Sequence, residues 1–242
     1  MSSKPLGQLV IGIKGAGEMA SGVAWRLHMA NLKNIFMMDV ASPLAVRRKV
    51  SFCEALLDGQ QTVEGVTAVR ADDVHNVSNI WHNGHIAVLT DPKWQTVQTL
   101  SCDVVIDAIL AKKNLGTTTA EAPLVVGLGP GFTAGEDVHL VIETNRGHNL
   151  GRIIESGPAD ANTGIPGAIG GHTTRRVLRA PGAGTFIATR AIGEIVSTGE
   201  AIGTVEDHPV LAELDGVIRG LIRSGSQVTE GLKIGDIDPR KQ

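Results

Sequence analysis

A chain of 242 residues with 42% hydrophobic and 19% charged side chains has the composition of a folded protein with one large or two modest domains. Its net charge of −3 and its 3% aromatic content exclude a basic, base-stacking surface, so we expect neither nucleic acid nor membrane as a partner. No apolar run reaches the roughly 18 residues of a membrane helix, and no signal-peptide pattern opens the chain. Because the two cysteines lack CxxC spacing, we expect a reduced, cytoplasmic setting, and because His82 and His85 have no further ligand at metal spacing, we expect no metal site.

The first element in chain order is a buried strand at 8–14, followed by a G-x-G-x-x-A turn and a helix at about 20–30. Gly15 permits the tight turn, Gly17 permits a phosphate to approach the backbone, and Ala20 lets the helix pack on the strand. A second strand ends in Asp39, near where a ribose-binding acid is expected. The pattern predicts a Rossmann-like unit that binds a phosphate-bearing small molecule; the alternative is a packing turn that binds nothing.

Strand and helix patterns alternate through the rest of the first half. A helix is expected from Ser42 to about Leu57, and Arg47 on it is a candidate phosphate ligand. A helical stretch is expected at 72–81, and strands are expected at 66–70, 85–89, 103–109, 123–128 and 138–143. This alternation predicts an α/β fold with a mainly parallel sheet covered on both faces.

Polar segments follow several of these strands, where ligands usually bind in parallel sheets. Lys112 and Asn114 lie in the segment 107–116, and we expect them to contact the ligand. Gly127, Gly129 and Gly131 can form a concave nest of backbone N–H groups that holds an anion. The plainer interpretation of these glycines is a turn that links two strands.

Glu143, Arg146 and His148 lie close together in an extended segment. They are candidates for acid–base catalysis, and they are equally explained as an ion pair that fixes a domain interface. The catalytic residues therefore stay unassigned, and the sequence leaves open whether the chain is an enzyme.

The last quarter of the chain repeats itself at an offset of 32 positions, within 176–238. Glycines at fixed offsets indicate turns, and the Val and Ile positions between them indicate short strands. Two such copies should pack on one another, which predicts a small all-β quasi-two-fold sandwich resembling biotinyl and lipoyl carrier domains. The turn between the copies, 206–209, lacks the lysine that such carriers modify. We expect a Rossmann-like domain at 1–150, a glycine-rich connector at 151–175 and the repeat domain at 176–242. The matched pairs are Ala180/Ala212, Gly184/Gly216, Gly193/Gly225, Val196/Val228, Gly199/Gly231, Ile202/Ile234, Gly203/Gly235 and Val205/Ile237.

Six segments together resemble the YqeB family, which is named as a component of the selenium-dependent molybdenum hydroxylase system of bacteria. The segments are Asp39–Gly59, Asp107–Gly116, Gly127–Gly135, Glu143–Gly151, Asn162–Gly167 and Lys233–Arg240. The resemblance covers nearly the whole chain. It extends more distantly to XdhC-type proteins, which have a Rossmann domain and serve in the maturation of xanthine dehydrogenase. The family's second-strand acid is often Glu, and Asp39 keeps the carboxylate.

The resemblance implies an accessory or maturation protein for a molybdenum hydroxylase, with a nucleotide or a molybdopterin-type ligand at the strand ends. NAD and a molybdopterin-type cofactor are the candidate cofactors. The expected partners are a client molybdenum hydroxylase and further copies of this chain. Two alternatives stay open: an NAD(P)-dependent oxidoreductase, and a non-catalytic scaffold whose repeat domain docks the client enzyme.

Overall fold

The computed structural model describes residues 4–164 and 167–240, and the chain divides into two compact units. The first unit comprises Met1–Pro43 and Val50–Thr163, and the second comprises Leu44–Lys49 and Gly164–Gln242. The division between Thr163 and Gly164 falls within the expected connector, 151–175. Six residues of the expected second helix, 44–49, belong to the second unit instead of the first.

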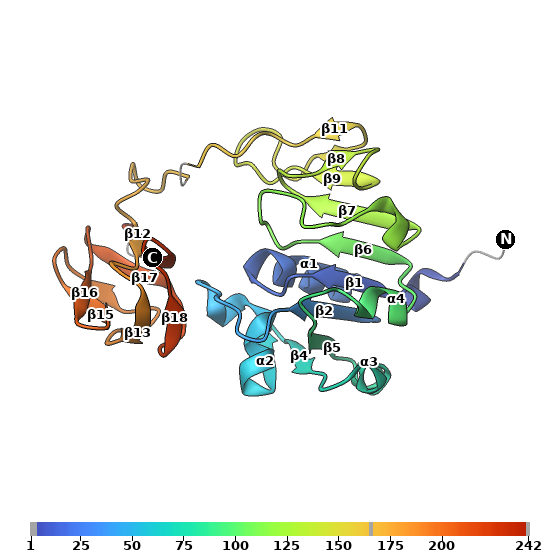
Figure 1. Cartoon of the computed structure of the whole chain (residues 1–242), viewed down its shortest axis with the longest axis horizontal. Helices are drawn as coiled ribbons and strands as arrows, with labels where there is room; N and C mark the ends of the chain where they lie inside the picture. Colours follow the sequence, from blue (N-terminus) through green and yellow to red (C-terminus); the bar gives the residue numbers. More distant parts are fainter. Residues whose placement is uncertain (1–3, 165–166, 241–242) are drawn as a thin grey trace. The chain divides into compact units, whose positions relative to one another are not determined.

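A nine-stranded sheet forms the first unit, in the order β10-β9-β7-β6-β1-β2-β5-β4-β3 (Figure 1). The strands from β9 to β4 are parallel, whereas β10 pairs with β9 and β3 pairs with β4 in antiparallel fashion. The strands are β1 (Ile11–Lys14), β2 (Ile35–Asp39), β3 (Gln60–Val63), β4 (Val66–Arg70), β5 (Ile86–Thr90), β6 (Val104–Asp107), β7 (Leu124–Leu128), β9 (Leu140–Ile142) and β10 (Ile153–Ile154). A separate small ladder joins β8 (Thr133–Ala134) to β11 (Gly157–Pro158).

The predicted Rossmann-like sheet is wrong, because the observed sheet is mixed and has a different strand order. In a Rossmann sheet the third strand lies beside the second, whereas here β5 separates β2 from β4. The hairpin of β3 and β4 was not expected. Its two turn residues, Glu64 and Gly65, have φ values of 45° and 82°, which suits a tight antiparallel turn.

The helices of the first unit are short apart from α1. The helix α1 (Glu18–Met29) begins after Gly17, and the others are α2 (Ala55–Asp58), α3 (Val77–His82) and α4 (Thr96–Thr99). The 3-10 turns are η1 (Leu6–Gln8), η2 (Arg48–Val50), η3 (Phe52–Glu54), η4 (Val74–Asn76) and η5 (Thr119–Glu121).

The expected helix from Ser42 to Leu57 is replaced by η2, η3 and α2. The physical reason is that its apolar residues serve two different cores. Val46 packs on the core of the second unit, whereas Phe52 and Cys53 are fully buried in the first. One continuous helix presents a single apolar face and cannot supply both.

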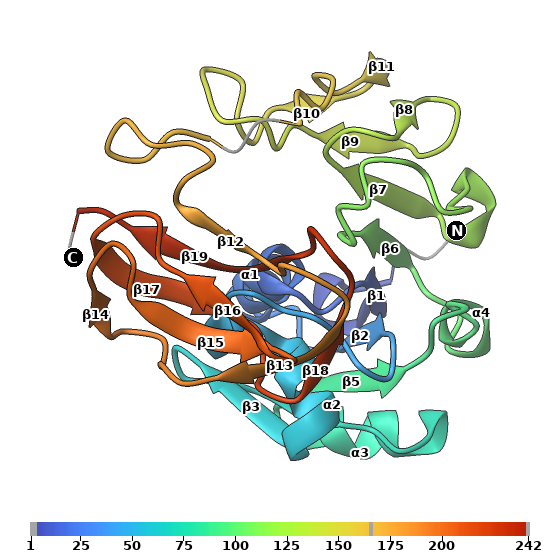
Figure 2. The ribbon, with the colours of Figure 1, turned by 60° about the vertical axis from the view of Figure 1, so that its left-hand side comes forward.

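Two four-stranded antiparallel sheets form the second unit, in the orders β12-β19-β17-β14 and β16-β15-β13-β18 (Figure 2). The 32-residue repeat relates the strands in pairs: β12 to β16, β13 to β17, β14 to β18, and β15 to β19. Each sheet therefore takes strands from both copies of the repeat. The strands are β12 (Val177–Arg179), β13 (Gly184–Ala188), β14 (Ile195–Val196), β15 (Ala201–Val205), β16 (His208–Leu211), β17 (Gly216–Leu221), β18 (Ser226–Val228) and β19 (Lys233–Asp238).

Two of the repeat glycines are required by close approach of other backbone. A Cβ added to Gly203 would lie 2.3 Å from the Ile187 carbonyl oxygen, and one added to Gly216 would lie 2.4 Å from that of Asp238. The paired Ile202 and Ile234 between such glycines are fully buried in the shared core.

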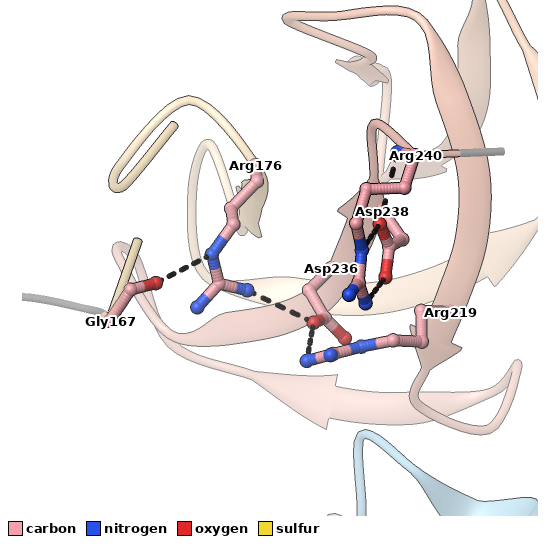
Figure 3. Close-up of polar contacts among 6 residues, drawn as sticks. All are labelled: Gly167, Arg176, Arg219, Asp236, Asp238 and Arg240. Atoms are coloured by element: carbon pink, nitrogen blue, oxygen red, sulfur yellow. Dashed lines mark hydrogen bonds and ion pairs between the residues drawn. The ribbon is translucent and has the colours of Figure 1, made fainter. Parts of the chain in front are cut away.

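Charged side chains lie along one face of β19 (Figure 3). Its two aspartates, Asp236 and Asp238, are buried. Asp236 Oδ2 accepts from Arg176 at 3.1 Å and from Arg219 at 2.5 Å, and Arg176 also donates to the Gly167 carbonyl at 3.2 Å. Asp238 and Arg240 form a two-pronged pair with N···O distances of 2.9 and 2.7 Å. The arginines thus offset the charge of aspartates that face away from the apolar core.

Within residues 4–164 and 167–240, no helix combines the length and the apolar character that crossing a membrane requires.

Both thiols should be unreactive in the native protein. Cys53 and Cys102 are buried, and burial, with a smaller contribution from the charge of Asp103, raises the pKa of Cys102 to about 12. We expect a thiol reagent at pH 8 to label neither cysteine until the protein unfolds. A cysteine placed at the exposed Gln98 should react at once. Native-state labelling of Cys102 at a similar rate would contradict its burial.

The pair of Asp238 and Arg240 should make stability depend on acid pH. Hydrogen bonds from the Arg240 side chain, opposed by burial, lower the pKa of Asp238 from 3.8 to about 2. Because the folded pKa is depressed, the stabilisation is present above about pH 4 and is lost as the pH falls towards 2. Arg240→Gln should therefore lower the midpoint of urea unfolding at pH 6, and the gap from wild type should close between about pH 4 and 2. Arg179→Gln removes a hydrogen bond to the Gly231 carbonyl, which does not titrate, so its gap should not change with pH.

Candidate functional site

The loops that follow the parallel strands of the first unit pack against one another through glycines. A Cβ added to Gly15 would lie 3.1 Å from Ile109 Cα, and one added to Gly131 would lie 2.6 Å from Lys113 N and Cα. A Cβ on Gly129 would lie 2.4 Å from Thr144 Oγ1. The Gly15–Gly17 turn and the polar segments 107–116, 127–135 and 143–148 therefore contact one another in series.

These contacts give the predicted anion nest a different role. The Cβ position of Gly127 is occupied by the Phe132 ring at 2.5 Å, and those of Gly129 and Gly131 are occupied as described above. Gly127 thus makes room for a side chain of its own loop, and Gly129 and Gly131 make room for neighbouring loops, as expected of a turn that links two strands. An anion-holding role for Gly127, Gly129 and Gly131 stays a prediction.

The turn at Gly15–Gly17 is held through Ala16, and Asp39 is part of that support. Asp39 Oδ2 accepts the Ala16 N–H at 2.8 Å, and Oδ1 accepts that of Val40 at 2.8 Å. Burial raises the pKa of Asp39, and these two hydrogen bonds oppose the rise. Both carboxylate oxygens are engaged by backbone, so a ribose contact by Asp39 stays a prediction. Gly17 has open space at its Cβ position, and Ala20 is fully buried.

A buried lysine lies at the centre of the edge, at the end of β1. The Lys14 side chain is 1% exposed, and its Nζ lies 2.7 Å from Thr117 Oγ1 and 2.7 Å from the Glu121 carboxylate. The Thr117 hydroxyl donates to Asp107 Oδ2 at 2.7 Å, at the end of β6. Lys14 and the two carboxylates therefore form one network that joins the central strands to the following loop.

Asn114 shapes the loop that carries Thr117. Its Oδ1 accepts the N–H groups of Gly116 and Thr117 at 2.8 and 2.7 Å, and its Nδ2 donates to the Thr117 carbonyl at 2.8 Å. Asn114 thus positions the Thr117 hydroxyl between Lys14 and Asp107. Lys112 is exposed, with a φ of 62°. Arg47 belongs to the second unit, so the structure does not group it with the other candidates.

A pocket of about 460 Å³ lies at the end of β9, beside Glu143. Glu143 is 2% exposed, and its two oxygens accept the N–H groups of Asn145 at 2.6 Å and Asp160 at 2.7 Å. Arg146 and His148 are exposed and do not line this pocket. The lining residues are Glu143, Asn149, Arg152, Ile153, Ile154, Glu155, Ser156, Pro158 and Asp160.

A second cavity, of about 520 Å³, lies at the ends of β4 and β5, but its carboxylates are committed locally. Asp91 accepts from Thr96 N and Oγ1 at 2.7 Å, Asp73 accepts the His75 N–H, and Asp72 pairs with Arg70 at 2.9 Å. Each of these carboxylates is therefore engaged by its own turn. The lining of this cavity offers no set of free charged side chains that point together into the space.

Sequence reasoning missed Lys14, Thr117, Glu121 and Arg152. Only Lys14 gave a signal, as a charge at the end of a strand whose four residues are all buried. Among the residues that the structure describes, no group of three or more His, Cys, Asp or Glu side chains could hold a metal ion.

No family model matches the chain. Among curated proteins, it is 49% identical over 238 residues to "Uncharacterized protein YqeB" from Escherichia coli (strain K12). The match covers 98% of this chain and 44% of that protein, so the chain spans less than half of the relative's length. The resemblance to the YqeB family is confirmed over this region, and the link to selenium-dependent molybdenum hydroxylases is not part of that similarity.

Three solved structures are similar at low identity. A succinylglutamate desuccinylase/aspartoacylase from Rhodobacter sphaeroides is 16% identical with a TM-score of 0.29, over 95% of this chain and 84% of that one. An aspartoacylase family protein from Mesorhizobium loti is 11% identical with a TM-score of 0.31, over 95% and 84%. The ectoine utilization protein EutE from Ruegeria pomeroyi is 11% identical with a TM-score of 0.25, over 94% and 56%.

These comparisons and the observed sheets correct two predictions. Neither the curated relative nor the three solved structures are named as molybdenum hydroxylase maturation proteins, and the solved structures are named as acylases and an ectoine utilization protein, so the predicted role in such maturation, with its molybdenum and selenium association, is not supported. The predicted pairing of a Rossmann-like domain with a carrier-type sandwich is corrected by the observed sheets, which are one mixed sheet of nine strands and two antiparallel sheets of four strands. TM-scores of 0.25–0.31 are too low to transfer an activity to this chain.

Removal of Lys14 should destabilise the first unit strongly. Lys14→Met would leave the Glu121 carboxylate without its cation and the Thr117 hydroxyl without its donor, and loss of one partner from a buried pair costs about 3–5 kcal/mol. Lys93→Met, at an exposed lysine, should cost less than about 0.5 kcal/mol. Urea unfolding of both variants tests this expectation. Equal stability of Lys14→Met and wild type would show that the network contributes little.

Proposed function

We propose that the first unit binds a small metabolite carrying both an anionic and a cationic group, in the pocket beside Glu143. The observation that carries the proposal is the pocket's lining, which offers Arg152 as a cation and Glu155 and Asp160 as carboxylates around one concave space. A cavity of about 460 Å³ has the size that small-molecule sites usually have.

Two of these charged side chains are uncommitted. Arg152 and Glu155 are exposed and make no side-chain hydrogen bond or ion pair with the part of the chain that the structure describes. An arginine fork matches the geometry of a carboxylate or a phosphate. A free carboxylate suits an ammonium group. A ligand of amino-acid type supplies both groups within the size of the pocket.

Glu143 holds the pocket's walls and is not free for proton transfer. Its side chain fixes the backbone at Asn145 and Asp160, and its own N–H donates to the Arg152 carbonyl at 3.0 Å. Its carbonyl accepts from Gly151 N at 2.8 Å. Glu143 thus orients residues on several sides of the site. This supports a positioning role in place of the predicted acid–base one.

Two earlier expectations remain proposals beside this one. A phosphate on the ligand would suit Arg152 as well as a carboxylate does. Self-association of the chain, which we expected from the sequence, is testable by measuring its mass in solution.

Thermal-shift and calorimetric titration with a panel of amino acids, their decarboxylated amines and their deaminated acids tests the proposal. We expect the zwitterionic members to bind more tightly than either truncated series. Arg152→Gln should raise the Kd of the best ligand about tenfold or more, because it removes a charge-assisted contact.

Arg146→Gln is the matched control, since Arg146 is exposed in the same segment but does not line the pocket. Its ligand affinity should equal that of wild type. The proposal fails if no member of the panel binds, or if the two arginine variants weaken binding equally.

A further inference from the structure

The loop between β2 and η3 passes through both units. Its flanks, up to Pro43 and from Val50 onward, belong to the first unit, and its middle, Leu44–Lys49, belongs to the second. Six residues, 40–45, lie between Asp39 and Val46, and two residues, Val50 and Ser51, lie between Lys49 and Phe52. The loop therefore joins the units covalently at two points close together in sequence.

Both ends of this loop are fixed to one residue of the first unit. The Ala16 N–H donates to Asp39 Oδ2 at 2.8 Å, and the Ala16 carbonyl accepts the Cys53 N–H at 2.8 Å. The Ser21 hydroxyl strengthens the second anchor, because it donates to the Ala16 carbonyl at 3.1 Å and accepts the Phe52 N–H at 2.7 Å. Ala16 is fully buried inside the Gly15–Gly17 turn.

The middle of the loop makes several contacts with the rest of the second unit. Val46 packs on the apolar core, and a Cβ added to Gly220 would lie 2.8 Å from Val46 Cγ1 and 2.9 Å from the Val46 carbonyl oxygen. Arg48 Nε donates to the Leu221 carbonyl at 3.2 Å, and Lys49 Nζ donates to that of Ile192 at 2.9 Å. The loop is thus part of the packing around β17.

We propose that the loop 40–53 is a mechanical coupling, through which a change at the Gly15–Gly17 turn alters the stability of β17 and β19, and the reverse. Because few residues separate these anchors, a displacement at one of them must move the others or break one of the contacts. Coupling between two sites is reciprocal in free energy, so each unit reports on the other. The inference goes beyond the proposed function, because it requires no ligand in the pocket beside Glu143.

Hydrogen exchange of the full chain, read by mass spectrometry, tests the coupling. Asp39→Ala removes the anchor at Ala16 and changes no residue of the second unit. We expect the amides of β17 and β19 to exchange about five- to tenfold faster, as the loss of one buried hydrogen bond implies. The reverse variant, Val46→Ala, should accelerate exchange at the Gly15–Gly17 turn by a similar factor.

Asp103→Ala is the matched control. Asp103 also accepts a backbone N–H, that of Val10 at 2.7 Å, but it lies at the other end of β6 and is not attached to the loop. In the Asp103→Ala variant, the amides of β17 and β19 should exchange at the wild-type rate. Equal acceleration by Asp39→Ala and Asp103→Ala would overturn the proposal, because it would show global destabilisation.

Lengthening the loop separates coupling from other effects. Four Gly-Ser residues inserted after Pro43, and four more after Lys49, should give the loop enough slack to uncouple the units. In that background, Asp39→Ala should no longer change exchange in β17 and β19. The proposal is wrong if Asp39→Ala still accelerates exchange in β17 and β19 when the loop is lengthened. It is also wrong if Val46→Ala leaves hydrogen exchange at the Gly15–Gly17 turn at the wild-type rate.

Discussion

The arrangement of the first unit depends on the absence of a side chain at a few loop positions. Gly15, Gly129 and Gly131 each face atoms of a neighbouring loop at distances that no Cβ tolerates without movement. Any larger residue there would push apart loops that follow adjacent strands. The pocket beside Glu143 and the network around Lys14 are built from those same loops, so their geometry rests on this close packing.

The sequence predicted the local elements better than their assembly. The strands expected at 66–70 and 123–128 lie at β4 and β7, and the repeat offsets match the strands of the second unit one by one. Periodicity and glycine spacing report on local conformation. Strand order depends on which crossovers form, and no residue near β5 signals that it pairs with β2.

The candidate site was only partly visible for a related reason. Glu143 and Asn114 were singled out because they are polar residues after strands, but their roles as supports of backbone follow from hydrogen bonds that a linear pattern does not show. Arg152 was not expected, since it lies in a segment without periodicity. Arg47 was assigned to a helix of the first domain because sequence proximity gave no sign that six residues join the second unit.

The interleaving of the two repeats has a consequence for biosynthesis. Val46 leaves the ribosome long before β17, against which its segment packs. At a synthesis rate of about 5–20 residues per second, that interval is roughly ten to thirty-five seconds. Because both sheets of the second unit include strands from the second repeat, neither can close until that repeat has emerged. Val46 must therefore stay unpacked in the meantime, and apolar side chains that are exposed during synthesis are the surfaces that chaperones bind.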